Sequence, residues 1–464
     1  MGKVQIYENK YYSHFPPKSL KLGELRGINL HYICSLITDY TQNIPMPFSP
    51  FRSVRFSFLA LLLLFLYCQG WSQSFPDDFT EAPTLAWTFS SAGPVYASPV
   101  IEKGTVYFGS LDSSVYALHA KTGQLQWKFK TGGDIRSTVS LDEKNVYCVS
   151  GDGCLYAIGK KNQQLRWKFK GRGDRKYELY SFADYFQSSP VIDRNVIYFG
   201  SGDGYVYAVN KINGTLLWEY QTQSVVHSTP TVHRGKVYVG SFDGHLYALH
   251  AQDGRLVWKY KAAGHPYFPK GEMQGSPTVF EDLVFIGSRD YQLYALNAET
   301  GKEVWKKQFP KGWAMGKPVV RDGVLYVGTS DDKVLAALQP RTGETIWLSD
   351  VKFNIFGGVA FSKNRLYVGT LMGRLYAIDL QSGQTQWLIN NSLYEKKRLR
   401  YLKEDDTYRN DIQTVIKKND DFLTMYYELG AIFSTPVIAQ DMLIISSTDG
   451  NVYGYQSNRG SGKS

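Results

Sequence analysis

The sequence is poor in the motifs that many enzyme classes require. Its 464 residues include four cysteines and eight histidines, and no His-x-His or His-x-x-x-His spacing occurs, which argues against a zinc site. No Gly-x-Ser-x-Gly elbow is present, and the segment 316–318 (Gly-Lys-Pro) lacks the flanking residues of a phosphate loop. The formal net charge of +10, part of which falls in the first 72 residues, is too mild to indicate a nucleic-acid partner.

Long apolar runs are also missing, with one exception near the N-terminus. The apolar stretch Phe56–Tyr67 follows a basic segment; it is short for a membrane span but typical of a signal peptide. We predict that residues 46–72 are a signal peptide cleaved after Ser72 and that residues 73–464 are exported. Residues 1–45 are then an over-extended start or a disordered extension.

The few cysteines leave two alternatives open. Cys68 allows a lipid anchor, although the bulky Tyr67 before it disfavours lipidation. Cys148 and Cys154 flank one hairpin, and export makes a disulfide chemically possible. Because their positions match ordinary strand residues in the other copies of the repeat described next, we expect free, packed thiols.

One unit recurs along most of the chain. Residues 236–258 read KVYVGSFDGHLYALHAQDGRLVW, and close copies occupy 105–127, 196–218 and 283–305. Alternating residues predict strands and the Asp-Gly pairs predict tight hairpins, so each unit of about 40 residues is expected to form four antiparallel strands. One such unit cannot bury both of its faces, whereas stacking between copies does so.

The number of copies predicts a closed ring. The last repeat, which ends at Tyr455, has three strands and no tryptophan, while Trp87 lies in a strand with no unit before it. We predict that the strand around Trp87 completes the last blade. The fold is then all-β, an eight-bladed propeller of four-stranded antiparallel blades without open sheet edges. The repeat tryptophans, to which we assign structural docking roles, are Trp87, Trp127, Trp167, Trp218, Trp258, Trp305, Trp347 and Trp387.

The repeat resembles the quinoprotein (PQQ-type) β-propeller repeat over about residues 84–456. The shared pattern is Ser/Thr-x-Pro, Tyr-x-Gly-Ser/Thr, Leu/Val-Tyr-Ala and Gly-x-x-x-Trp, and the resemblance implies that each indole packs between neighbouring blades. Gln163 and Pro83 depart from the glycine position, and Ala336 replaces the usual tyrosine. The matching glycines are Gly123, Gly214, Gly254, Gly301, Gly343 and Gly383.

The resemblance covers both enzymes and non-catalytic scaffolds. The quinoprotein dehydrogenases that it includes carry adjacent bridged cysteines and Glu/Asn/Asp ligands for calcium, and their quinone needs a metal to polarise its carbonyl. This sequence has no Cys-Cys pair, and its Asp-Gly turns lack the further carboxylates of a calcium loop. The chain also resembles the propeller lipoprotein of the outer-membrane β-barrel assembly machinery.

We therefore expect an exported, non-catalytic scaffold, periplasmic or associated with the outer membrane, for which the resemblance implies a role in outer-membrane protein assembly. It is expected to be a monomer that binds a protein partner and no cofactor or nucleic acid, and to reach a membrane only through a partner or a lipid anchor. The alternative is a dehydrogenase that uses pyrroloquinoline quinone with calcium to oxidise an alcohol or a sugar.

Three connections are longer than the others: 171–187, 261–274 and 389–430. Each leads from an outer strand to the next inner strand, so they share the rim that carries the Asp-Gly hairpins, and we expect the third to be helical. Long insertions on one face mark a binding surface more often than chance, and aromatic residues and arginine are common interface anchors. The alternative is that the aromatics plug the channel mouth or pack under 389–430. The candidate partner-binding residues are Tyr180, Phe182, Tyr185, Phe186, Tyr267, Phe268, Trp313, Arg398 and Arg400.

Overall fold

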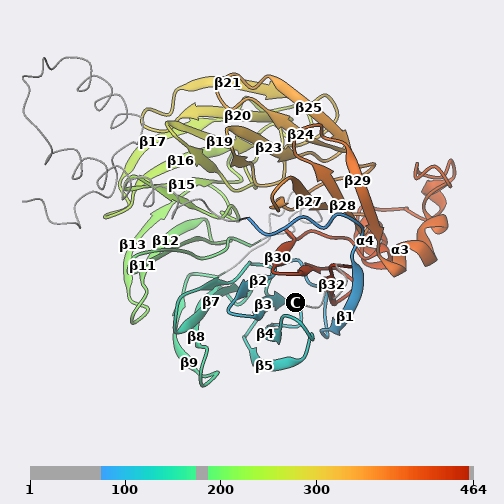
Figure 1. Cartoon of the computed structure of the whole chain (residues 1–464). Coiled ribbons are helices and arrows are strands. Elements are labelled where there is room, and N and C mark those ends of the chain that lie inside the picture. Colours follow the sequence, from blue (N-terminus) through green and yellow to red (C-terminus); the bar gives the residue numbers. More distant parts are fainter. Residues whose placement is uncertain (1–74, 174–186, 459–464) are drawn as a thin grey trace, which may run out of the picture. The chain divides into compact units, whose positions relative to one another are not determined.

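The computed structural model describes residues 75–173 and 187–458 (Figure 1). The predicted extension and signal peptide, with Cys68, lie outside these residues. The described chain forms eight four-stranded antiparallel sheets arranged as the blades of a ring. This confirms the predicted eight-bladed propeller.

In blades 1 to 4, each blade is built from four strands consecutive in the chain. Blade 1 comprises β2 Val100–Glu102, β3 Thr105–Ser110, β4 Ser114–His119 and β5 Leu125–Lys130. Blade 2 comprises β6 Ser140–Leu141, β7 Asn145–Ser150, β8 Cys154–Gly159 and β9 Leu165–Lys170. Blade 3 comprises β10 Val191–Asp193, β11 Val196–Gly200, β12 Tyr205–Asn210 and β13 Leu216–Gln221. Blade 4 comprises β14 Thr231–His233, β15 Lys236–Gly240, β16 His245–His250 and β17 Leu256–Lys261.

Blades 5 to 7 repeat this order, and blade 8 combines both ends of the described chain. Blade 5 comprises β18 Thr278–Phe280, β19 Leu283–Gly287, β20 Gln292–Asn297 and β21 Glu303–Gln308. Blade 6 comprises β22 Val319–Arg321, β23 Val324–Gly328, β24 Val334–Leu338 and β25 Thr345–Asp350. Blade 7 comprises β26 Ala360–Phe361, β27 Arg365–Gly369, β28 Arg374–Asp379 and β29 Thr385–Asn390. Blade 8 comprises β30 Val437–Ala439, β31 Met442–Ser446, β32 Asn451–Gln456 and β1 Thr84–Ser90.

The burial of the strands explains the sequence pattern of the repeat. The second and third strands of a blade, such as β15 and β16, are covered on both faces by neighbouring blades and are buried along nearly their whole length. Both faces of these strands are therefore apolar, so the alternation in the sequence distinguishes two buried faces and not a buried face from an exposed one. The outer strand β17 alternates between exposed and half-buried residues, because only one of its faces meets another blade.

The ring closes through the strand that precedes the first complete repeat. β1 pairs antiparallel with β32, from Thr84 opposite Gln456 to Ser90 opposite Asn451. The predicted closure is therefore confirmed, and blade 8 gains its outer strand from the N-terminal side of the ring. Pairing the two ends also covers the sheet edge that β32 would otherwise expose.

Six of the docking tryptophans pack on a glycine of the next blade, which accounts for the Gly-x-x-x-Trp motif. Trp218 of blade 3 donates its Nε1–H to the carbonyl oxygen of Ala251 at 2.9 Å. A Cβ atom added to Gly254 of blade 4 would lie 2.6 Å from that indole, and the glycine has φ of +73°. Glycine is thus favoured at this position by the left-handed backbone and by the close approach of the ring.

Blade 2 lacks this glycine, which allows a direct test. Gln163 occupies the equivalent turn with φ of +55°, where a side chain is unfavourable. We expect Gln163→Gly to raise the free energy of unfolding by about 0.5–1 kcal/mol, because it removes this strain. Urea denaturation measures the change. Asn162→Gly, at a neighbouring position without positive φ, should lower the stability, and a loss in both variants would contradict the interpretation.

Cys148 and Cys154 are free and buried, as expected for packed strand residues. Burial raises the pKa of both thiols, so neither is an activated nucleophile.

Candidate partner-binding face

One face of the ring, called the loop face here, carries the hairpins between second and third strands and the connections between blades. Each connection lies on the hairpin of the next blade: the backbone N–H of Gln223 donates to Asp243 Oδ2 at 3.0 Å, and that of Phe242 donates to the carbonyl oxygen of Val225 at 3.0 Å. The prediction that hairpins and connections share a face therefore agrees with the contacts.

The aspartates of these hairpins have structural partners. Asp243 Oδ2 accepts a hydrogen bond from the Tyr247 hydroxyl at 2.7 Å, and burial with this bond raises the pKa of the tyrosine. Among the described residues, no group of three His, Cys, Asp or Glu side chains is placed to hold a metal ion. The same tyrosine-to-aspartate bond joins Tyr116 to Asp112, Tyr156 to Asp152, Tyr207 to Asp203, Tyr294 to Asp290 and Tyr453 to Asp449.

The connection after β17 presents an exposed tyrosine on a small, well-defined turn. The backbones of His265 and Phe268 exchange two hydrogen bonds, at 3.0 and 2.9 Å. Tyr267, at the tip of this turn, is 70 % exposed. Phe268 is half-buried and packs edge-on against Trp313, with 4.9 Å between ring centroids.

A buried arginine, Arg289, packs against these aromatic rings. Arg289 has no exposed surface, and its guanidinium lies 5.0 Å from the ring centroids of both Phe242 and Trp313 and 6.0 Å from that of Phe268. Its Nη2 donates to Gln274 Oε1 at 2.9 Å. A guanidinium packed against aromatic rings is a favourable contact when it is desolvated. Arg289 therefore stabilises the arrangement of these three rings.

Two further residues, Tyr291 and His265, join this cluster and were not among the predicted site residues. Tyr291 takes the place of the hairpin glycine found in other blades and has φ of +70°. Its ring stacks on His265, with 4.2 Å between centroids. The replacement of Asp-Gly by Asp290-Tyr291 is the sequence signal that could have identified it, because a tyrosine in left-handed backbone is uncommon.

The insertion 389–430 folds into short helices, as expected. They are α3 Ser392–Lys397, the 3-10 turns η2 Arg398–Arg400 and η3 Ile412–Thr414, and α4 Asp420–Leu429. Asn391 caps α3 by accepting a hydrogen bond from the N–H of Leu393 at 2.8 Å, and Gly430 ends α4 with φ of +68°. Side-chain capping and a left-handed terminal glycine are the usual limits of short helices.

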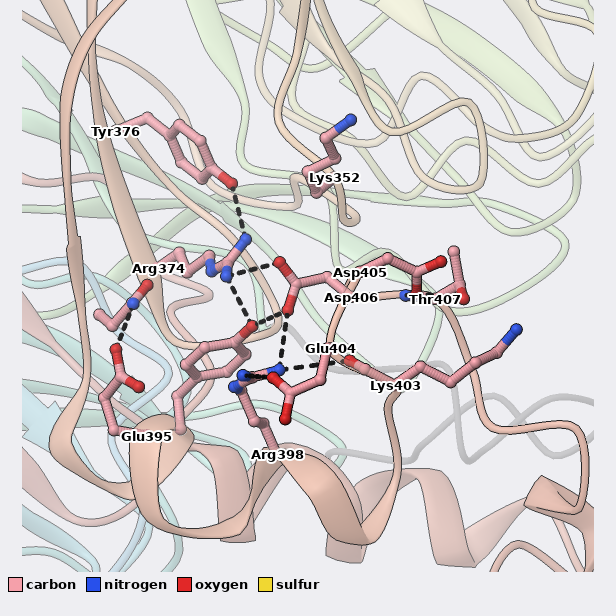
Figure 2. A network of polar contacts seen from close by, with 12 residues as sticks. Lys352, Arg374, Tyr376, Glu395, Arg398, Lys403, Glu404, Asp405, Asp406 and Thr407 are labelled. Atoms are coloured by element: carbon pink, nitrogen blue, oxygen red, sulfur yellow. Dashed lines mark hydrogen bonds and ion pairs between the residues drawn. The ribbon is translucent and has the colours of Figure 1, made fainter.

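A polar network ties the insertion to blade 7 (Figure 2). Arg374 of β28 forms an ion pair with Asp406 at 2.7 Å and donates to the Tyr394 hydroxyl at 2.6 Å. Tyr394 in turn donates to Asp406, and Arg398 lies 3.7 Å from the same carboxylate. Burial raises the pKa of Tyr394, and its bond to Asp406 adds to this effect.

Beneath this network the insertion packs on residues of the channel wall. Met425, Tyr426 and Leu429 of α4 belong to one core cluster with the wall residues Tyr96 and Phe433. The Tyr96 hydroxyl also donates to the Tyr427 hydroxyl at 2.9 Å. The insertion is therefore an integral part of the loop face, attached by both apolar and polar contacts.

The structure separates the predicted partner-binding residues into three groups. Tyr267 and Arg400 are exposed, and Arg400 pairs with Glu428 at 3.1 Å. Phe268, Trp313 and Arg398 mainly pack or pair within the loop face. The other four candidates, Tyr180, Phe182, Tyr185 and Phe186, lie outside the described residues.

The described residues of the channel do not offer the donors that a quinone with calcium requires. None of the described residues that line its cavity is an aspartate or a glutamate. The two cysteines within the described ranges are free and lie within one blade, not side by side in sequence. These residues do not fit the calcium-bound quinone of the dehydrogenases, so they give no basis for a redox step through that group.

These observations define the class of protein: an eight-bladed propeller of quinoprotein-like repeats with a helical insertion on its loop face. The family described as outer membrane protein assembly factor BamB matches residues 69–183, 180–269 and 268–390. The chain belongs to this family. No curated protein matches the sequence. No helix of the described residues is long and apolar enough to cross a bilayer.

Solved structures share the fold at low sequence identity. BamB from Moraxella catarrhalis is 16 % identical over 81 % of this chain and 100 % of its own, with a TM-score of 0.60. The computationally designed Ika8 protein is 15 % identical over 81 % of this chain and 100 % of its own, also with 0.60. Quinohemoprotein alcohol dehydrogenase from Comamonas testosteroni is 13 % identical over 80 % of this chain and 76 % of its own, again with 0.60. A BamB protein, a designed protein and an alcohol dehydrogenase are matched alike, so these likenesses show the fold alone.

Proposed function

We propose that this protein is an exported, non-catalytic scaffold that binds a protein partner on its loop face during outer-membrane protein assembly. The observation that carries the proposal is the exposed Tyr267 at the tip of a turn whose next residue, Phe268, packs against Trp313 and Arg289. An aromatic anchor that is already held in place loses little conformational entropy when it is buried in a complex.

Three further observations support a scaffold over the quinone-dependent alternative. The family of the chain is described as an assembly factor. The part of the channel wall that the structure describes has no carboxylate to bind calcium. The sequence also predicts a signal peptide at residues 46–72, which is consistent with an exported scaffold.

The proposal predicts that capture of the partner depends on the exposed residues of the loop face. We expect Tyr267→Ala and Arg400→Ala each to weaken capture from solubilised cell envelopes by about tenfold, because interface anchors of this kind contribute about 1–2 kcal/mol or more. The melting temperature should stay within the range of ordinary surface substitutions, since neither side chain is buried.

Two residues on the opposite rim serve as matched controls. Ile212 is 71 % exposed in the turn between β12 and β13, and Arg255 pairs with Asp253 at 2.7 Å between β16 and β17. Ile212→Ala and Arg255→Ala should leave capture unchanged. Equal losses in test and control variants, or no loss in any variant, would contradict a binding site on the loop face.

A further inference from the structure

A ring of hydroxyl groups surrounds the central channel and is interrupted at one place. At equivalent positions of the inner strands, six blades carry a serine or threonine whose oxygen accepts a hydrogen bond from the backbone N–H of the same position one blade earlier, at 2.9–3.3 Å. Blades 6 and 7 instead carry Lys317 and Gly358, which have no hydroxyl group. The hydroxyl-bearing positions are Ser98, Thr138, Ser189, Thr229, Ser276 and Thr435.

The interruption removes the acceptors of two successive backbone donors. By the pattern of the ring, the N–H of Ser276 would bond to a hydroxyl at position 317, and the N–H of Lys317 to one at position 358. Within the described chain neither N–H has a hydrogen-bond acceptor. Backbone donors without any partner are rare in folded proteins, so these two groups must be satisfied by water or by a ligand in the channel. Because Gly358 has no side chain, the ring itself cannot supply the second acceptor.

The gap in the hydroxyl ring also carries the ammonium group of Lys317, which has no counter-ion among the described residues. The cavity of the channel has a volume of about 330 Å³, and its described lining includes Lys317, Arg136 and His227 but no carboxylate. Arg136 pairs with Asp134 at 3.2 Å, whereas Lys317 has no ion-pair or hydrogen-bond partner in the described part of the chain. The Lys317 side chain is accessible to solvent, although protein atoms surround it on most sides. Both properties fit a side chain that faces the channel.

Burial lowers the pKa of Lys317, because the surrounding protein displaces water without providing a negative charge. An anion beside the ammonium would have the opposite effect. A charged donor and backbone N–H groups without a protein acceptor, on residues that line one cavity, are the usual elements of an oxyanion site.

We propose that the channel binds a small oxyanion, a phosphate or the carboxylate of an organic acid, at the gap formed by Lys317 and Gly358. The ammonium and the backbone N–H of Lys317 hold the anion, and the N–H of Ser276 and the hydroxyl of Thr435 flank it. This site is separate from partner binding by Tyr267 and Arg400, so each can fail without the other.

Calorimetric titration of the purified protein tests the site. Sodium phosphate and sodium succinate represent the two sources of the oxyanion, and sodium chloride at equal ionic strength controls for screening. We expect saturable binding of phosphate, of succinate or of both, and binding at least about tenfold weaker in Lys317→Met, which keeps the length of the side chain but not its charge. Lys317→Ser should weaken binding similarly while restoring the hydroxyl group found in the other blades.

Lys259→Met is the matched control, since Lys259 is an exposed lysine of the outer strand β17. It should bind as the unmodified protein does. Saturation by phosphate alone or by succinate alone supports the site and shows whether it prefers a phosphate or a carboxylate. Absence of saturable binding by both, or equal binding by the Lys317 and Lys259 variants, would overturn the proposal.

Discussion

Replacing Trp87 by alanine is expected to lower the free energy of unfolding by about 3–5 kcal/mol, as large truncations of buried aromatic residues do. Trp87 is 8 % exposed and donates its Nε1–H to the carbonyl oxygen of Ala120 at 3.0 Å. Its indole also covers Gly123 of blade 1, where an added Cβ would lie 2.6 Å from the ring. The substitution therefore opens a cavity at the junction that closes the propeller, between the N-terminal strand and the first complete blade.

Urea denaturation and the melting temperature measure this effect. Thr88→Ala is the control, because Thr88 is the next residue of β1 and is exposed; it should change the stability by less than about 0.5 kcal/mol. Trp87→Phe should give an intermediate loss, since it keeps most of the apolar contact but not the hydrogen bond. If Trp87→Ala melts at the same temperature as the unmodified protein, β1 is not needed for closure.

Substituting Arg374 by methionine is expected to destabilise the attachment of the insertion by about 3 kcal/mol. The side chains of Arg374 and Asp406 are 11 % and 20 % exposed, and removing one partner of a largely buried ion pair leaves the other charge without compensation. The buried hydroxyl of Tyr394 loses a donor as well. The effect should be local, so we expect faster tryptic cleavage within 389–430 together with a lower melting temperature.

A double variant and a control make this result specific. Arg374→Met with Asp406→Asn should recover part of the loss, because the uncompensated carboxylate is removed. Arg409→Met should have little effect, since the ion pair of Arg409 with Asp411 is mostly exposed to solvent and exposed pairs contribute at most about 1 kcal/mol. Equal cleavage rates in all variants would show that apolar packing alone holds the insertion.

The fold could be predicted from the sequence because the residues that specify it lie close together in the chain and recur in each repeat. Hairpin signals such as Asp243-Gly244 and docking pairs such as Gly254 with Trp218 recur at almost constant spacing. A repeat that must stack on its own copies permits few architectures. Even the closing strand was predictable, because the last repeat lacked a tryptophan and Trp87 lacked a blade.

The candidate site was predictable only in part. Chain order places the long connections and Tyr267 on one face, since connections between blades alternate with the turns of the opposite rim. The burial of Phe268 and Trp313 against Arg289 was not predictable, because these residues come from different blades and their contacts depend on the angle between blades. The unusual Tyr291 marks the hairpin of Arg289, but nothing in the sequence indicates that the arginine side chain packs under the rings.

The sequence by itself determined the repeating strands, their number and the strand that closes the ring, because each depends on residues within one or two repeats. Only the tertiary structure decided which side chains face the channel and which face solvent. Lys317 shows the difference: in the sequence it is a single lysine that belongs to no phosphate loop, and in the ring it stands where six other blades place a hydroxyl group. The position of Lys317 in the channel depends on eight inner strands that meet around one axis. No single stretch of the chain specifies that position.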